Sequence, residues 1–560
     1  MRIVSGRKTS TTWWPEWRAA RLLALALAAL LVLAACGDEP LDDDVTVDDD
    51  AVDDPADDPE PDEPAEPDDA DHAELRIRTV MDITTLDPNV MPSTTDDAVA
   101  ANVLEGLVAY EPGGSGELVN VLAEEVEVAD DGLSVDFTLK EGIQFHGGYG
   151  ELTAEDVKFS FERVAGLIED PVETSYASDW ATLEEVEVTD TYSGTIHLSE
   201  PFAPLMINTL PGNAGLVVSQ AAVEELGEDF GTNPIGTGPY EFVSWSPGQE
   251  IVLERFADYS GAAYDELMDE PQWERIVFVP IEDDSAADIA IETGEVDFGQ
   301  ISTGSVERFE ADDGFEVNPL TTFDYGWIGM NVQDEVLSDV NVRRAIRQAL
   351  DIDAMIAAGF DGQVTRAHAL VSPEMPIGHW EDAPVYDPDP DAARAYLDDA
   401  GVDDLTLSMI IDDQTGARAI AEIAQANLAE IGITLDIDLL DGGEYREVAR
   451  DAQQQLFYIS FSNTADPSWA TVWFSCEQVG DWNYMHWCNE DFQELHEAAL
   501  TETDPDVRHD MYVEMQEIMD EDAVAAWVMY RTNLYTYPPD LQPSLVPERY
   551  GKYLAADFRR

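Results

Sequence analysis

The stretch DDGLSVDFTLKEGIQFHGGYGELTAEDVKFSFERV, residues 130–164, indicates the fold class because it predicts a strand followed closely by a helix. Apolar and polar residues alternate over 133–139, as on a β-strand that buries one face. Thr153 is a suitable helix N-cap, with Asp156 three residues later and apolar residues at helical spacing beyond it. The stretch therefore predicts mixed α/β structure.

The same alternation of strands and helices continues along the chain. Further helices are expected at 342–350, 391–400, 415–431 and 490–502, and strands at 251–256, 274–281, 405–411 and 434–440. No repeat with a period of 20–50 residues interrupts the pattern, which excludes a solenoid. We therefore expect an α/β protein with more than one folded lobe.

The N-terminal segment indicates export. The apolar run LLALALAALLVLAA at 22–35 has 14 residues, which is short of the roughly 20 that span a bilayer but suits a signal peptide. It ends in Leu33-Ala34-Ala35-Cys36, which resembles a bacterial lipobox, where the cysteine is lipidated after cleavage. We expect a lipoprotein signal peptide over 1–35 and a lipid anchor on Cys36. An ordinary secretory signal is the alternative.

Acidic residues dominate the composition, with 119 Asp and Glu against 27 Lys and Arg and a formal net charge of −92. Residues 36–72 are predicted to be the lipidated cysteine and a disordered acidic linker, because Pro and like charges leave little apolar surface to bury. The acids continue through the rest of the chain, which favours a solvated, halophilic surface over a site for a cation or basic partner. No basic stripe exists to bind nucleic acid.

No motif in the chain indicates catalysis, although this absence does not by itself exclude an enzyme, and we expect no cofactor. Cys476, His486 and Cys488 could in principle ligate zinc. In an exported protein, two cysteines twelve residues apart more often form a disulfide, and we expect a Cys476–Cys488 bridge and no metal.

Several motifs occur together in one order along the chain. They are LDPNV (86–90), VLEGLVAYEP (103–112), NPIGTGPYEFVSW (233–245), IETGEVDFG (291–299), DVNVRRAIRQALDIDAMI (339–356) and YDPDPDAARAYLDDAG (386–401), together with the strand–helix stretch quoted above. In this order they resemble family 5 of the extracellular solute-binding proteins, which serve ABC transporters of peptides and nickel. The resemblance covers roughly residues 75–540.

The resemblance implies a two-lobed, periplasmic-binding-protein-like α/β fold of type II, with an extra subdomain and a ligand cleft between the lobes. Lobe one would comprise 73–320 plus 504–560, and lobe two 321–503. The protein would be a monomer that captures an organic solute, peptide-like or other, outside the cytoplasmic membrane or in the periplasm. It would not be an enzyme, and it would hand this solute to a permease and ATPase complex. A ligand sensor without transport and, less strongly, an exported metalloprotein are the alternatives.

Peptide-binding members of the family carry an aspartate in a W-x-x-D-x-x-[DE]-P setting that pairs with the α-ammonium of the peptide. In SFSNTADP, residues 460–467, the corresponding residue is Asn463, which cannot form the charge-assisted bond of a carboxylate. A gap of one residue could instead bring Asp466 into this role. His486 has no firm correspondence to the histidine that serves nickel binding in some relatives.

Aromatic residues near this segment are the remaining candidates for a ligand wall. The predicted ligand-binding set is Asn463, Phe461, Asp466, Trp469, Trp482, Asn483, Tyr325 and Trp327. Core packing is the alternative for each tryptophan, and packing within a half-buried sheet is the alternative for Tyr325 and Trp327.

Overall fold

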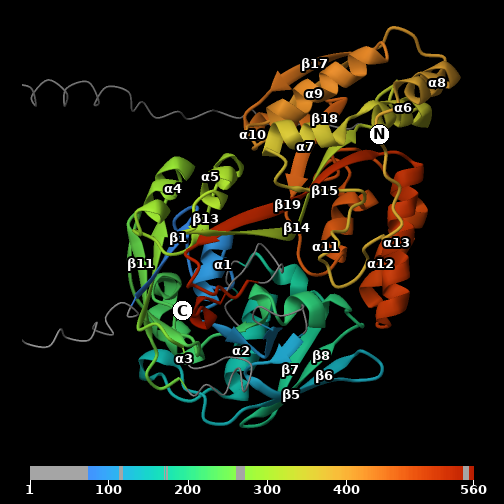
Figure 1. Cartoon of the computed structure of the whole chain (residues 1–560). Coiled ribbons are helices and arrows are strands. Elements are labelled where there is room, and N and C mark those ends of the chain that lie inside the picture. The colour runs from blue at the N-terminus through green and yellow to red at the C-terminus, as the bar shows by residue number, and fades with distance from the viewer. Residues whose placement is uncertain (1–73, 112–117, 169–170, 172–173, 260–270, 546–553) are drawn as a thin grey trace, which may run out of the picture. The chain divides into compact units, whose positions relative to one another are not determined.

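The computed structural model describes residues 74–111, 118–168, 171, 174–259, 271–545 and 554–560 (Figure 1). The predicted signal peptide, Cys36 and the acidic linker lie outside the described residues. Among the residues that are described, no helix is both long and apolar enough to cross a membrane.

The stretch that predicted the fold class forms the expected strand and helix. β6 spans Ser134–Leu139 and α2 spans Ala154–Ala165, which begins at a capping box between Thr153 and Asp156. Gly166 ends α2 at a φ of 74°, a left-handed conformation that glycine adopts without strain. β6 belongs to an antiparallel sheet in the order β5-β6-β8-β7, with β5 at Ala123–Val128, β7 at Leu183–Asp190 and β8 at Ser193–Leu198. The apolar face of α2 packs on this sheet in one core.

A second sheet of the first lobe has the order β1-β12-β11-β10. Its strands are β1 (Glu74–Thr79), β10 (Tyr240–Ser246), β11 (Glu250–Arg255) and β12 (Arg275–Pro280). β1 pairs parallel with β12, and the other neighbours are antiparallel. Four short helices also precede residue 316 in the chain. They are α1 (Thr94–Ala100), α3 (Gln220–Leu226), α4 (Asp284–Glu292) and α5 (Val306–Glu310).

The largest sheet extends from the first lobe into the second. Its order is β13-β19-β14-β18-β16-β17, and β15 pairs with β19. The strands are β13 (Gly299–Gln300), β14 (Glu316–Met330), β15 (Thr365–Arg366), β16 (Thr406–Ile411), β17 (Thr434–Leu439), β18 (Leu456–Phe461) and β19 (Ala525–Tyr537). β14 and β19 are long antiparallel partners that run through the centre of Figure 1. Tyr535 and Tyr537 pack in the first-lobe core, whereas Ala526 and Val528 pack in a second-lobe core.

Helices cover both faces of the second-lobe part of this sheet. One core contains residues of α6 (Val340–Ala349), α7 (Ile352–Phe360), α8 (Pro390–Ala400) and α9 (Ala417–Glu430). The other contains residues of α10 (Gly442–Arg450), α11 (Ser468–Thr471), α12 (Glu490–Thr501) and α13 (Pro505–Glu521). The helices predicted from periodicity correspond to α6, α8, α9 and α12 within a few residues.

The position of α13 bears on the predicted lobe boundary at residue 504. α13 lies beside α12, and its Tyr512, Met515 and Met519 share a core with Trp487 and Phe492 (Figure 1). We therefore propose that the chain changes lobes within β14 and β19, and that α13 belongs with lobe two.

The arginines of α6 stabilise the end of α13. Arg343 donates to the carbonyl oxygen of Asp522, Arg344 to that of Glu521 and Arg347 to that of Asp520. The last carbonyls of a helix have no partner within the helix, and cations near them interact favourably with the helix dipole. The role of Arg343 and Arg344 in the described structure is therefore to join two helices.

Candidate ligand-binding site

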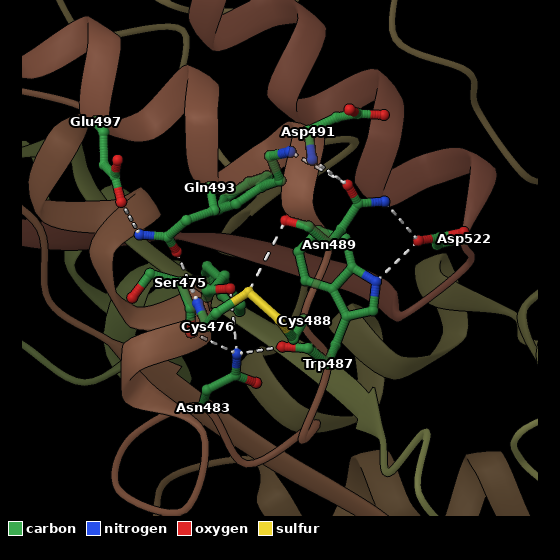
Figure 2. Close-up of a disulfide and its surroundings, with 12 residues drawn as sticks. Ser475, Cys476, Asn483, Trp487, Cys488, Asn489, Asp491, Gln493, Glu497 and Asp522 are labelled. Carbon is green, nitrogen blue, oxygen red and sulfur yellow. Dashed lines mark hydrogen bonds between the residues drawn. A yellow bond between two sulfur atoms is a disulfide. The ribbon is translucent and has the colours of Figure 1, made fainter.

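The segment that follows β18 is closed by the Cys476–Cys488 disulfide, whose Cα atoms lie 4.6 Å apart (Figure 2). Both sulfur atoms are engaged, so a zinc site with His486 would lack two of its three proposed ligands. His486 instead places Nε2 2.8 Å from the carbonyl oxygen of Ala449. Within the described parts of the chain, no group of three or more His, Cys, Asp or Glu residues could hold a metal ion.

Asn483 organises the inside of this loop. Its Nδ2 donates to the carbonyl oxygens of Phe474, Ser475 and Trp487 at 3.1, 3.1 and 2.7 Å, and the residue is buried (Figure 2). This predicted ligand-binding side chain thus joins two stretches of backbone, 474–475 and 487. Because its Nδ2 already has these partners, Asn483 is not part of the proposed binding surface.

Asp466 forms a fully buried ion pair with Arg508. The carboxylate accepts two bonds from the guanidinium, at 2.5 and 2.8 Å, and a third from the backbone N–H of Ser468 at 2.9 Å. The two side chains are 0% and 2% exposed. Such a bidentate pair satisfies both charges internally. Asp466 therefore has a structural partner, which speaks against its use as a substitute for the aspartate of the peptide-binding relatives.

Asn463 is also buried, but a carboxylate lies beside it. Its Oδ1 accepts from Thr464 N at 2.9 Å, and its Nδ2 lies 3.4 Å from Met375 Sδ. Its backbone N–H donates to Oδ1 of Asp324 at 3.2 Å. Asp324 comes from β14, so this bond joins the segment after β18 to the strand that links the lobes.

A bulge in the central strands brings Asp324 next to Arg531. Between the pairs Thr321–Thr532 and Tyr325–Tyr530, β14 contains residues 322–324 whereas β19 contains Arg531 alone. Extra residues of this kind bend a strand and redirect its side chains. Nε of Arg531 lies 3.3 Å from Oδ2 of Asp324.

The two members of this pair differ in exposure. The side chain of Asp324 is 6% exposed and that of Arg531 is 48% exposed. Burial raises the pKa of Asp324 to about 6, with Arg531 and the Asn463 N–H acting in the opposite direction. Nη2 of Arg531 also donates to Oγ of Ser460 at 3.2 Å. The carboxylate is thus buried on one side and meets a partly solvated cation on the other.

Sequence reasoning missed both Asp324 and Arg531. The sequence does show an acid between two aromatic residues, Phe323-Asp324-Tyr325. In a chain with 119 acidic residues, one such acid does not indicate a binding site. The bulge that brings the two charges together leaves no pattern in the sequence.

Four of the predicted aromatic residues meet in one cluster around Phe461. The ring centroid of Phe461 lies 4.9 Å from Trp327, 6.1 Å from Trp482 and 6.4 Å from Tyr325. Trp469 reaches the cluster through Trp473, at 5.3 Å. These are edge-to-face contacts, an arrangement that aromatic pairs favour.

The members of this aromatic cluster differ in burial. Tyr325 and Trp327 are buried, and within the described structure their hydroxyl and indole N–H have no hydrogen-bond partner. Phe461, Trp469 and Trp482 are partly exposed. Arg450 covers one face of Trp482 at 5.3 Å from the ring centroid. Of the predicted rings, Phe461, Trp469 and Trp482 are therefore the ones that keep some exposed surface.

The chain is similar in sequence to known solute-binding proteins. Residues 117–481, more than half of the chain, match the model of bacterial extracellular solute-binding proteins, family 5. The dipeptide-binding protein of Escherichia coli is 28% identical over 469 residues, covering 78% of this chain and 85% of the relative. The glutathione-binding protein GsiB of Salmonella typhi is 28% identical over 448 residues, with the same coverage.

A solved structure supports the fold independently. The periplasmic binding protein DppA of Helicobacter pylori, in complex with peptide STSA, superposes with a TM-score of 0.71. It is 22% identical, and the match covers 87% of this chain and 98% of that chain. The two-lobed α/β fold expected from the sequence is thereby confirmed.

Proposed function

Since the chain belongs to family 5 of the bacterial extracellular solute-binding proteins, we propose that it captures a peptide-like solute outside the cytoplasmic membrane and delivers it to the permease of an ABC importer. Solute-binding proteins of this kind act by binding and release. Lobes joined by a few strands can close on a solute, and the affinity then depends on the stability of the closed state.

The choice of a peptide-like solute is supported by the relatives and by the aromatic cluster. Two curated relatives are named for dipeptides and glutathione, and the solved structure from Helicobacter pylori holds a peptide. The observation that supports it most in this chain is the set of partly exposed rings Phe461, Trp469 and Trp482. Aromatic faces contact apolar side chains such as those of peptides.

The attachment and assembly state belong to the same proposal. The lipobox-like Leu33–Cys36 supports a lipid anchor on Cys36. We propose a monomer that carries out no chemical step. A sensor without transport would use the same binding surface, and import assays in cells that lack the permease distinguish the two roles.

The proposal is tested on the purified protein. Native mass spectrometry is expected to show a co-purified peptide, and tryptophan fluorescence should respond to dipeptides, glutathione or peptide STSA. If no compound in the panel binds and the protein carries a different class of solute, the peptide-like assignment fails while membership of the family stands.

One substitution tests the aromatic surface. Trp482→Ala is expected to weaken binding about tenfold, since losing one desolvated aromatic contact costs roughly 1–2 kcal/mol. Trp245→Ala is the matched control, because Trp245 is a partly buried tryptophan on β10 of the first lobe. Unchanged affinity in the Trp482 variant would remove this residue from the binding surface, and failure to fold would assign it to the core.

A further inference from the structure

We propose that Asp324 supplies the negative charge that position 463 lacks, so that the site takes a solute with a primary ammonium group, which displaces the guanidinium of Arg531. This inference rests on the proposed function and names the chemical group that the site selects. It also predicts that the protein retains a preference for free amino termini although Asn463 cannot provide one.

Geometry is the first support for Asp324. Its Oδ1 lies 3.2 Å from the backbone nitrogen of Asn463, so a carboxylate is present within one hydrogen bond of position 463. The carboxylate reaches this place from β14 because the bulge between Thr321 and Tyr325 inserts extra residues there. The carboxylate thus belongs to β14, the strand that pairs with β18, and lies next to position 463.

The second support is the nature of the resident cation. Asp324 is nearly fully buried, and a buried carboxylate requires a partner. Arg531 meets it through Nε at 3.3 Å, and its side chain is 48% exposed. Ion pairs with a solvated partner contribute roughly 0–1 kcal/mol, so moving Arg531 into solvent costs little when another cation takes its place.

The third support is what surrounds the carboxylate. Oδ1 accepts the Asn463 N–H, and Oδ2 faces Arg531. The aromatic cluster adjoins this point through Tyr325, which follows Asp324 in β14 and lies 6.4 Å from Phe461. A peptide whose ammonium group meets Asp324 would therefore have an aromatic surface within reach of its first side chains.

The test compares each peptide of the panel with its N-acetylated form by isothermal titration calorimetry. The wild-type protein is expected to bind the free amine about tenfold to a hundredfold more tightly, the effect of one charge-assisted hydrogen bond. Asp324→Asn should reduce this ratio to about threefold or less while leaving the affinity for the acetylated peptide unchanged. The acetylated peptide therefore also reports whether the variant is folded.

Three further variants complete the experiment. Asp436→Asn removes the same charge from an exposed position on β17 and should keep the wild-type ratio. Asp324→Asn combined with Asn463→Asp should restore the preference, because it returns the carboxylate to position 463. Arg531→Gln removes the competing cation at a partly exposed position and should tighten binding of the free amine a few-fold without affecting the acetylated form.

The outcomes separate this inference from the proposed function. If the wild-type protein binds free and acetylated peptides equally well, or if Asp324→Asn retains the wild-type ratio, the role of Asp324 is wrong and peptide binding stands. If no peptide of either form binds, the proposed function fails and this inference fails with it. If Asp324→Asn does not fold, an unchanged affinity of Arg531→Gln for free amines overturns the inference, and a selective increase supports it.

Discussion

Two aspartate–arginine pairs flank the segment that follows β18, and they differ in burial and geometry. In the closed pair, Asp466 and Arg508 make two parallel contacts with side chains that are 0% and 2% exposed. In the open pair, Asp324 meets Arg531 through Nε, and the arginine side chain is 48% exposed. The same two residue types therefore form two different kinds of pair around one segment of the chain.

The comparison shows that burial determines how an aspartate–arginine pair behaves in this strongly acidic protein. In a buried bidentate pair, water cannot reach either charge to take the place of its partner. The closed pair therefore holds the segment after β18 in one position. A pair with one solvated partner can exchange that partner for another cation at little cost. Exposure of the arginine, more than the presence of the aspartate, distinguishes a structural pair from a candidate recognition group.

Breaking the closed pair should have the largest effect. Arg508→Met is expected to lower the free energy of unfolding by about 3–5 kcal/mol, because it leaves the carboxylate of Asp466 buried without a counter-charge. The matched change in the open pair, Arg531→Met, should cost less, because the pKa of Asp324 is already raised to about 6 and its carboxyl can take up a proton when the cation is removed. Urea denaturation followed by tryptophan fluorescence measures both values. Equal losses in the two variants would contradict the distinction between the pairs.

Opening the disulfide should have the next largest effect. Replacing Cys476 and Cys488 by serine removes the closure of a short loop, which is worth roughly 3 kcal/mol on the chain-entropy account. The loop carries Trp482 but neither charged pair, so the variant should unfold at lower urea concentration while keeping its preference for free amines. A reducing agent should shift the midpoint of the wild-type protein and leave that of the variant unchanged. A shift in both would show that the bridge is not the cause.

The pH dependence of the open pair is the third expected effect. The pKa of Asp324 is raised from 3.8 to about 6, so the folded protein holds this proton more strongly than the unfolded chain. This favourable contribution is complete below about pH 4 and is lost as the pH rises through 6. Asp324→Asn has no such proton, so the stability of the wild-type protein relative to this variant should fall between pH 4 and 6. A constant difference across that window would refute the raised pKa.

The fold could be predicted in large part from the sequence because its signals are local. Alternation over 133–139 and the capping residues of 153–156 predicted β6 and α2, and the periodicity of the later helices placed α6, α8, α9 and α12 within a few residues. The order of the motifs added the two-lobed arrangement. These features depend on neighbours in the chain, which a sequence displays directly.

The candidate site could be predicted only in outline because its contacts join distant parts of the chain. The sequence indicated the aromatic cluster and the cysteine pair. It did not indicate which of the neighbouring polar residues already have a partner elsewhere in the structure. Asp466 is paired with Arg508, 42 residues away, and Asn483 is occupied by backbone carbonyls. The contact between Asp324 and Arg531 depends on a bulge between two strands. No periodicity encodes these long-range choices.

The pairing of β14 with β19 has a consequence for protein engineering. On the boundary proposed above, the second lobe begins on one of these strands and ends on the other, and the two are hydrogen-bonded partners from Glu316–Tyr537 to Gly329–Ala525. Its entry and exit points therefore lie side by side, as at the Thr321–Thr532 pair. A chimera that exchanges everything between these two residues with the same part of a relative would join the two chains at adjacent positions of one strand pair, and it would also have to keep the hydrogen bond from the Ala203 N–H to the Leu500 carbonyl oxygen. The second lobe, with its aromatic cluster and closed pair, could then be exchanged as one continuous segment of the chain.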